Sequence, residues 1–173
     1  MTKRTDRAQR RAAGWLTRTF AFALAALPLI SGCANFGAPP AELGGFEPYR
    51  VRGRTYVPLK KWQSYQEIGV ASWYGGRFHG RTTANGERFD SHSSTYTAAH
   101  RTLPFNVCAA VQHLPSGRSV IVRINDRGPF KRGRVIDLSR AAADELGVIG
   151  DGITRVKVSA IGIADADGRC RTA

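Results

Sequence analysis

The chain has 173 residues, 42% of them hydrophobic, and a formal net charge of +13. A chain of this length forms one domain with flanking segments, which excludes two large domains. The basic charge indicates an anionic polymer or surface as partner, or a solvated surface that keeps the protein soluble, and charge alone does not separate the two interpretations.

The N-terminal segment has the pattern of an export signal. Six basic residues stand among the first nineteen against one acid, Asp6, and an uncharged stretch runs from Phe20 to Ile30. Eleven residues are too few to cross a hydrocarbon layer of about 30 Å as a helix, which takes about 20. The stretch also lacks the polar face of an amphipathic core helix. We therefore predict a cleaved signal peptide at residues 1–32.

The uncharged stretch leads into residues 29–33, which read Leu-Ile-Ser-Gly-Cys and resemble the lipobox of bacterial lipoproteins. The resemblance implies cleavage before Cys33 and attachment of two or three acyl chains such as palmitate, enough for stable anchoring. Ala34 follows the cysteine in place of aspartate, which by resemblance to Gram-negative sorting favours the outer membrane, with the domain facing the periplasm. The alternative is an ordinary signal peptide with a cysteine nearby.

Export changes how the charge and the cysteines are interpreted. Cleavage before Cys33 removes six basic residues and one acid, so the formal charge falls from +13 to +8 over 141 residues. Outside the cytoplasm the anionic partners are cell wall and lipid headgroups, so we predict no nucleic acid partner. Cys108 and Cys170 then lie where disulfides form. Because Cys108 stands in an apolar run that suits a buried thiol, we predict unpaired thiols, with a bridge as the alternative.

Residues 34 to about 68 mix Gly, Pro, Arg and isolated aromatic residues, with prolines at 39, 40, 48 and 58. No hydrophobic period is sustained, which predicts a linker that is partly ordered next to the domain. Together with the lipidated Cys33 it forms the segment 33–68, which holds the domain away from its membrane.

Residues 69–160 change to short apolar runs separated by Gly, Pro, Asn and Asp. The runs predict strands at 69–74, 106–111, 119–124, 133–136 and 153–158, with a turn at 114–118. One helix is predicted at 140–146, with Ser139 as N-cap and Gly147 after its end. Many short strands favour a closed or nearly closed β-barrel, since closure removes exposed strand edges. Residues 161–173 are predicted to form a short polar tail.

Three motifs place polar residues on Gly- or Pro-containing loops beside these strands, where binding and catalytic groups tend to lie. They span residues 71–80, 83–104 and 125–139. In order and content they resemble the rare lipoprotein A family, whose domain is a double-psi β-barrel similar to those of barwin, expansins and some endoglucanases. The resemblance implies a mainly β domain over 69–160, a six-stranded double-psi β-barrel with one or two short helices.

Members of that family include lytic transglycosylases that cut the MurNAc–GlcNAc β-1,4 bond of peptidoglycan, with a preference for strands without stem peptides. The resemblance implies a lyase of cell-wall remodelling, monomeric and without a cofactor, with peptidoglycan glycan strands as partner. The family's important positions fall on Glu87, His100 and Asp126, with Asp90 in the same groove.

One carboxyl group suffices for this reaction, because it protonates the leaving oxygen while the C6 hydroxyl of muramic acid attacks C1 and forms the 1,6-anhydro product. We assign Asp126 as this acid and base, at the end of strand 119–124, although its spacing equally fits a turn-stabilising residue. Its pKa must be raised toward neutral pH. Glu87 is the candidate for an acidic neighbour that does so, and His100 for a hydrogen bond to substrate or carboxylate.

Aromatic residues near the first motif, Trp73, Tyr74 and Phe78, are candidates for contacts with sugar rings, together with Arg127. Because side chains alternate along a strand, one of Trp73 and Tyr74 is expected to face inward. Asp137 is expected to fix the start of the helix. No metal site is predicted, because the remaining histidines show no metal-ligand spacing.

Two departures from the family pattern leave room for other functions. Between Glu87 and His100 the chain is two residues longer, with 90–96 as the enlarged loop, and we expect no C-terminal SPOR domain and hence no septal targeting. These features favour a non-catalytic, expansin-like module that binds peptidoglycan. A third hypothesis, hydrolysis, requires a second carboxylate, for which Glu87 is the candidate.

Overall fold

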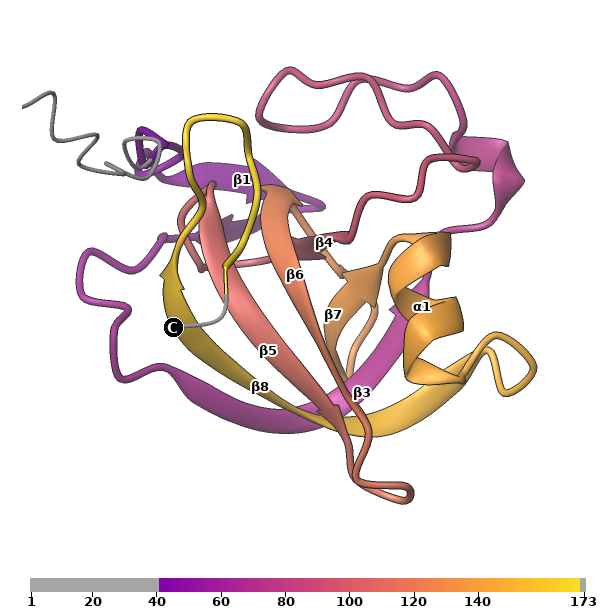
Figure 1. Cartoon of the computed structure of the whole chain (residues 1–173). Helices are drawn as coiled ribbons and strands as arrows, with labels where there is room; N and C mark the ends of the chain where they lie inside the picture. Colours follow the sequence, from indigo (N-terminus) through magenta and orange to yellow (C-terminus); the bar gives the residue numbers. More distant parts are fainter. Residues whose placement is uncertain (1–40, 172–173) are drawn as a thin grey trace, which may run out of the picture. The chain divides into compact units, whose positions relative to one another are not determined.

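The computed structural model describes residues 41–171. The predicted signal peptide, Cys33 and the first part of the predicted linker lie outside these residues. Six strands form a closed barrel (Figure 1). In their order around the barrel they are β3 (Gln66–Trp73), β7 (Arg134–Leu138), β4 (Thr97–His100), β6 (Ser119–Asp126), β5 (Val107–His113) and β8 (Ile153–Ile163). The six-stranded barrel implied by the family resemblance is confirmed.

The barrel contains one strand that the sequence did not predict. Strand β4 pairs in parallel with β6 and antiparallel with β7, and all four of its residues are buried. Its sequence, Thr-Ala-Ala-His, lacks the run of large apolar side chains that predicts a strand. Small side chains suit this position, because Ala98 and Ala99 are almost inaccessible between two neighbouring strands.

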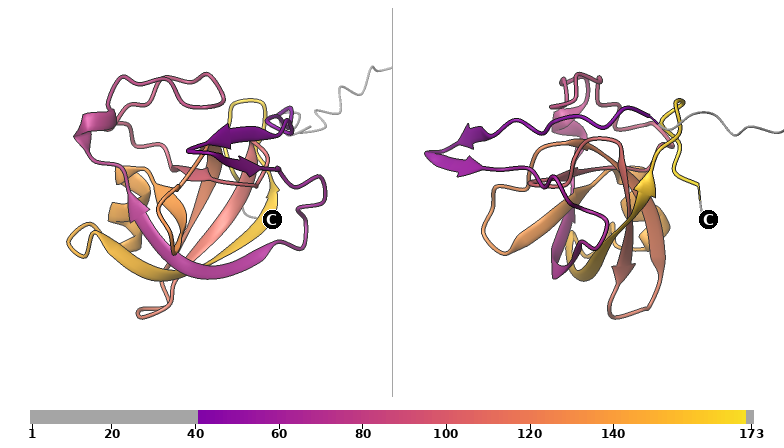
Figure 2. Two further views of the ribbon diagram at one scale, coloured as in Figure 1. Left: turned by 180° about the vertical axis from the view of Figure 1, so that it is seen from behind. Right: turned by 90° about the vertical axis from the view of Figure 1, so that its left-hand side faces the viewer.

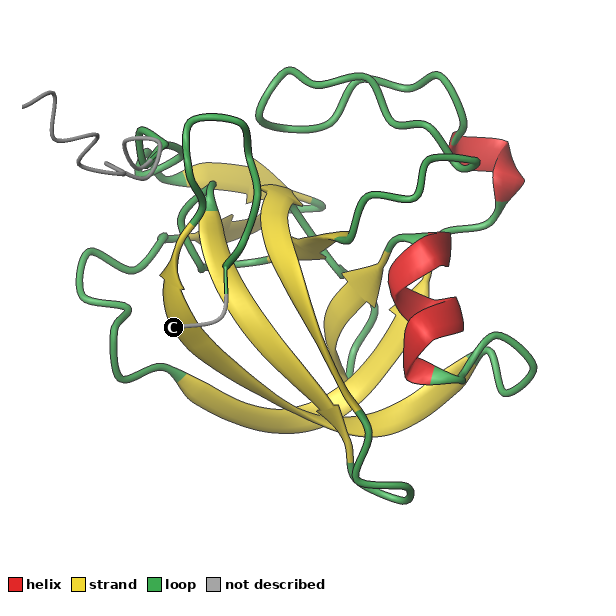
Figure 3. Ribbon diagram, viewed as in Figure 1, coloured by secondary structure: helices red, strands yellow, loops and turns green. Residues whose placement is uncertain are grey.

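The predicted helix is confirmed as α1 (Arg140–Leu146), which packs beside the barrel (Figure 1). The Ala142 N–H donates to Ser139 Oγ, and Gly147 takes the left-handed conformation with a φ of 77°. The only other helix among residues 41–171 is the short 3-10 helix η1 (Gly76–Phe78) (Figure 3). No helix in this part of the chain is long and apolar enough to span a membrane.

Much of the segment predicted as linker is folded against the barrel. Its backbone bonds to distant strands and loops, with Ala41 N–H donating to Ala164 O at 2.7 Å and Leu59 N–H to Thr102 O at 2.8 Å. Trp62 is buried in the core. A hairpin of β1 (Tyr49–Val51) and β2 (Arg54–Tyr56) lies at the same end of the barrel as the loop after β3 (Figure 2). Single apolar residues anchor this segment, so its sequence has no hydrophobic period that would predict ordered structure.

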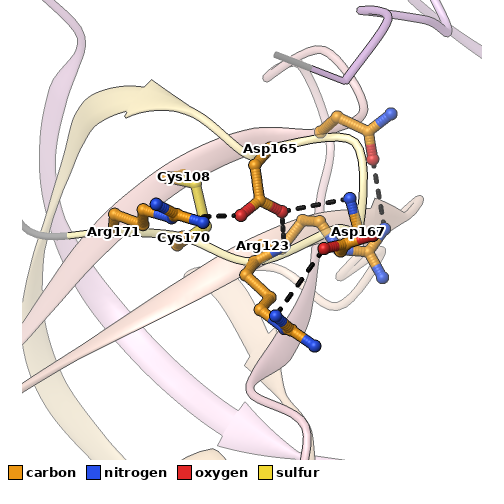
Figure 4. The surroundings of a disulfide bond; sticks show 8 residues. Cys108, Arg123, Asp165, Asp167, Cys170 and Arg171 are labelled. Carbon is orange, nitrogen blue, oxygen red and sulfur yellow. Dashed lines mark hydrogen bonds and ion pairs between the residues drawn. A yellow bond between two sulfur atoms is a disulfide. The ribbon is translucent and has the colours of Figure 1, made fainter. Parts of the chain in front are cut away.

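Cys108 and Cys170 form a disulfide, so the prediction of unpaired thiols was wrong (Figure 4). The tail turns back toward β5 because the Asp165 carboxylate accepts hydrogen bonds from the N–H groups of Asp167 and Arg169. The bridge spans a sequence separation of 62. A loop of that length stabilises the fold by about 4 kcal/mol in the chain-entropy account.

Candidate functional site

A cavity of about 570 Å³ opens between the loop after β3 and the turn after β6. Two carboxyl groups lie in its wall, among aromatic and basic side chains. A ligand with flat ring faces and negative charge is suited to such a surface. The lining includes the acids Asp126 and Asp137, the aromatic residues Tyr74, Phe78, Phe89 and Phe130, and the basic residues Arg52, Arg77, Arg81, Arg127, Lys131 and Arg134.

Asp126 ends strand β6 and faces this cavity. Both of its hydrogen bonds are accepted by Oδ1, from Ala84 N–H at 2.8 Å and from Arg127 N–H at 2.7 Å, so Oδ2 is left for a ligand. Burial raises the pKa of Asp126, although the two N–H groups and the Arg127 guanidinium oppose that shift. The turn that follows depends on Gly128, whose φ of 138° favours glycine. Asp126 thus stabilises the turn that follows it, and its carboxyl group has a raised pKa and one oxygen available to a ligand.

Asp137 is the second acid of the cavity, which corrects its predicted role at the helix start. Ser139 caps the helix instead, and Asp137 Oδ1 accepts a hydrogen bond from Ser72 Oγ at 2.6 Å. Arg134 lies 3.4 Å from Oδ2. Burial raises the pKa of Asp137, against Ser72 and Arg134, and the charge of Asp126 raises it further. The two carboxyl groups are therefore coupled electrostatically.

Glu87 does not line this cavity, so it is not the acidic neighbour that the sequence suggested for Asp126. Its carboxylate accepts two hydrogen bonds from Arg123, at 2.6 and 3.0 Å, and one each from Asn125 and Asn85. Burial raises the pKa of Glu87, but these hydrogen bonds and the charge of Arg123 outweigh it and hold the pKa at about 2. Glu87 therefore fixes the loop whose Ala84 N–H binds Asp126, and acts as a positioning residue.

Replacing Glu87 with Gln is expected to lower the free energy of unfolding by about 1 kcal/mol at pH 7, a value suited to a partly exposed ion pair. Because the pKa of Glu87 is depressed from 4.5 to about 2 in the folded state, its stabilisation is complete above pH 4.5 and is lost as the pH falls toward 2. Thermal unfolding of both proteins from pH 2 to 7 measures this. A difference in Tm that stays constant down to pH 2 would contradict the ion pair.

His100 is 1% exposed and does not line the cavity. Its Nδ1 accepts hydrogen bonds from Thr102 N–H at 3.1 Å and Leu103 N–H at 2.9 Å. Nε2 therefore carries the proton and donates to Tyr65 Oη at 2.8 Å. Burial lowers the pKa of His100 to about 3, helped by the charges of Arg101 and Arg127, so the ring is neutral at physiological pH.

Arg127 connects His100 to the cavity. Its guanidinium donates to the carbonyls of His100, Leu103 and Gly45, and its backbone N–H donates to Asp126. The Arg127 side chain thus lines the cavity, but its hydrogen bonds join backbone segments of the protein. Together, Glu87 and His100 support the two backbone segments that hold Asp126.

The other predicted residues divide between the cavity and the rest of the domain. Tyr74 and Phe78 line the cavity, whereas Trp73 packs against the barrel core, as the alternation along the strand predicts for one of the pair. Asp90 is exposed and accepts a hydrogen bond from His92 N–H at 2.8 Å, outside the cavity.

The enlarged loop 90–96 lies near α1. Ser139 Oγ donates to Thr95 O at 3.0 Å, and Tyr96 Oη donates to Glu145 at 3.2 Å. None of its residues lines the cavity. Loop 90–96 therefore does not contribute to the cavity wall next to Asp126.

A sequence profile of a family described as lytic transglycolase matches residues 66–158. The chain belongs to this family. The matched range contains Asp126, Asp137, Glu87 and His100, and residues 41–65 lie outside it.

Two similar relatives are both named endolytic peptidoglycan transglycosylase RlpA. That of Neisseria meningitidis serogroup B is 43% identical over 143 residues, which cover 83% of this chain and 59% of the relative. That of Pseudomonas aeruginosa strain UCBPP-PA14 is 54% identical over 114 residues, which cover 66% of this chain and 33% of the relative. The chain thus spans about one third to three fifths of the length of these relatives. A solved structure, the Streptomyces papain inhibitor, aligns with 58% of this chain and 99% of its own length at 22% identity and a TM-score of 0.47.

Proposed function

We propose that this chain is a lytic transglycosylase that cleaves the MurNAc–GlcNAc β-1,4 bond of peptidoglycan glycan strands and leaves a 1,6-anhydro product. The observation that carries the proposal is the Asp126 carboxyl, which is buried enough to have a raised pKa and has one oxygen available in an open cavity. Membership of the family and the activity named for the relatives support it.

The reaction needs one proton to move out and one to return. Protonated Asp126 donates from Oδ2 to the glycosidic oxygen, and the bond between that oxygen and C1 of muramic acid breaks. The C6 hydroxyl oxygen of the same sugar bonds to C1, and its proton passes to the Asp126 carboxylate. Throughout, Oδ1 stays bonded to the N–H groups of Ala84 and Arg127, which keeps the carboxyl in one orientation.

The remaining cavity residues support a preference for strands without stem peptides. Tyr74 and Phe78 line the cavity and supply aromatic surface for contact with sugar rings. Arg77, Arg81 and Lys131 supply positive charge to the same cavity. The lactyl carboxylate of muramic acid is free only where the stem peptide has been removed, and these cations then bind it.

The same proposal includes an exported, lipid-anchored protein that acts as a monomer. Cys33 is the expected site of acylation, with the outer membrane as the anchor and the domain in the periplasm. The Cys108–Cys170 disulfide supports export, because such bonds persist in oxidising compartments.

Incubation of the purified protein with sacculi whose stem peptides have been removed tests the activity. Mass spectrometry of the soluble products is expected to show anhydromuramic ends, with little release from sacculi that keep their peptides. Products heavier by one water, with reducing ends, would indicate hydrolysis and replace the proposal. Binding to sacculi without product would favour the expansin-like module.

A further inference from the structure

A second cavity adjoins the first at Asp126. Its volume is about 470 Å³, against about 570 Å³ for the first. Asp126 lies in the walls of both cavities, so the two cavities meet at this residue. The residues common to both linings are Thr82, Thr83, Asp126, Arg127 and Phe130.

The outer wall of the second cavity comes from the N-terminal hairpin segment, which we define as residues 45–56. Glu47, Tyr49 and Val51 line the second cavity, and Arg52 reaches the first. This segment precedes the range matched by the family profile. Figure 2 shows the hairpin across the end of the barrel that carries the loop after β3.

Specific contacts hold the N-terminal hairpin segment in place. Tyr49 Oη donates to Arg101 O at 2.8 Å. The rings of Tyr49 and Tyr56 stack at 5.3 Å between centroids, and the Phe130 ring lies 5.4 Å from that of Tyr56. Since Phe130 follows the Asp126 turn, the hairpin is packed directly on the segment that carries the candidate acid. The second cavity therefore has a fixed wall.

The two cavities differ in charge. Five basic residues line only the first cavity: Arg52, Arg77, Arg81, Lys131 and Arg134. The second cavity has Arg127, which it shares with the first, and adds the acid Glu47. A sugar with a carboxylate is therefore favoured on the first side of Asp126, and an uncharged sugar on the second.

We propose that the N-terminal hairpin segment forms a saccharide subsite in the second cavity, on the other side of Asp126 from the first. The inference rests on the proposed function for the identity of the polymer. A glycan strand passes along both cavities, with its scissile bond at the Asp126 carboxyl. The muramic acid unit that becomes the anhydro end lies in the first cavity, and the N-acetylglucosamine unit that leaves lies in the second. The segment outside the matched family range thus supplies half of the groove.

Binding measurements on an inactive protein test this arrangement. In the background of Asp126→Asn, the substitution Val51→Trp fills the second cavity. Thr55→Trp is the matched control, because Thr55 is exposed on the same hairpin and lines neither cavity. The probes are peptide-free disaccharides and octasaccharides of alternating GlcNAc and MurNAc, titrated by calorimetry. Val51→Trp is expected to raise the octasaccharide Kd about tenfold, which is 1.4 kcal/mol, and to leave the disaccharide Kd within about twofold.

A second variant guards against local misfolding. Glu47→Trp changes an exposed residue of the same cavity and is expected to raise the octasaccharide Kd in the same way, whereas Thr55→Trp leaves both affinities unchanged. Equal effects on both probes, or none on the octasaccharide, would overturn the subsite. If neither probe binds the Asp126→Asn protein itself, the result contradicts the proposed function rather than the subsite.

Discussion

Replacing Asp126 with Asn is expected to abolish release of anhydromuramic products from peptide-free sacculi. Removal of a general acid lowers kcat on the order of 10²–10⁴-fold. Asn keeps an oxygen that accepts from Ala84 and Arg127 but has no carboxyl proton to transfer, so folding and glycan binding are expected to persist. Mass spectrometry gives the rate, and calorimetry gives the Kd. Product release at the wild-type rate would remove Asp126 from the mechanism.

The raised pKa of Asp126 predicts whether Asp126→Asn stabilises or destabilises the protein. A carboxyl whose pKa is raised in the folded state loses stabilisation as the pH rises through that value, because the buried charge is costly. Asp126→Asn removes this cost and is expected to be at least as stable as the parent at pH 7. An inactive variant with an unchanged or higher Tm therefore separates a chemical role from a structural one.

Asp137→Asn is the matched control within the same cavity. The charge of Asp126 raises the pKa of Asp137, whereas the pKa of Asp126 is set by burial, by the N–H groups of Ala84 and Arg127 and by the Arg127 charge. Asp137→Asn is therefore expected to leave the pH at which kcat falls by deprotonation of Asp126 close to that of the parent, and to lower kcat at the optimum by less than Asp126→Asn does. If Asp137→Asn alone abolishes the products, the roles of the two acids must be exchanged.

The fold was predictable where local sequence carries the signal. Strands β5 and β6 contain short apolar runs, and β8 alternates branched apolar with polar residues. Helix α1 has both its cap and its terminal glycine. Strand β4 has no such signal, because its small residues are buried by neighbours far away in the sequence. The hairpin segment and the disulfide depend likewise on partners that are distant along the chain, such as Arg101 and Cys108.

Among the residues predicted for the site, half line the cavity (Asp126, Arg127, Tyr74 and Phe78) and half do not (Glu87, His100, Asp90 and Trp73). Motif position identified Asp126, Glu87 and His100, and all three lie in or beside the segments that form the cavity wall. Spacing does not reveal which way a side chain points. Glu87 was expected to be an acidic neighbour of Asp126, and His100 to hydrogen-bond substrate or carboxylate, although the partners of both are other protein groups. Asp137 was assigned to the nearby helix, because its contact with Ser72 joins strands 65 residues apart.

Replacing His100 with Ala is expected to lower the free energy of unfolding by about 3–5 kcal/mol. The change leaves a cavity in the core and removes the acceptor of the Thr102 and Leu103 N–H groups and the donor to Tyr65. Activity is expected to fall as well, since Arg127 is held by the carbonyls of His100 and Leu103. Denaturant unfolding and the rate of product release measure the two effects.

His100→Asn distinguishes a positioning role from a chemical one. The Asn side-chain oxygen reaches the position of Nδ1 and accepts from the same backbone N–H groups, so part of the stability and most of kcat are expected to return. Because the pKa of His100 is lowered from 6.5 to about 3, folding excludes its proton, and the stabilisation over His100→Asn is expected to shrink as the pH falls from 6.5 toward 3. A folded His100→Asn protein as inactive as Asp126→Asn would instead place the imidazole in the reaction.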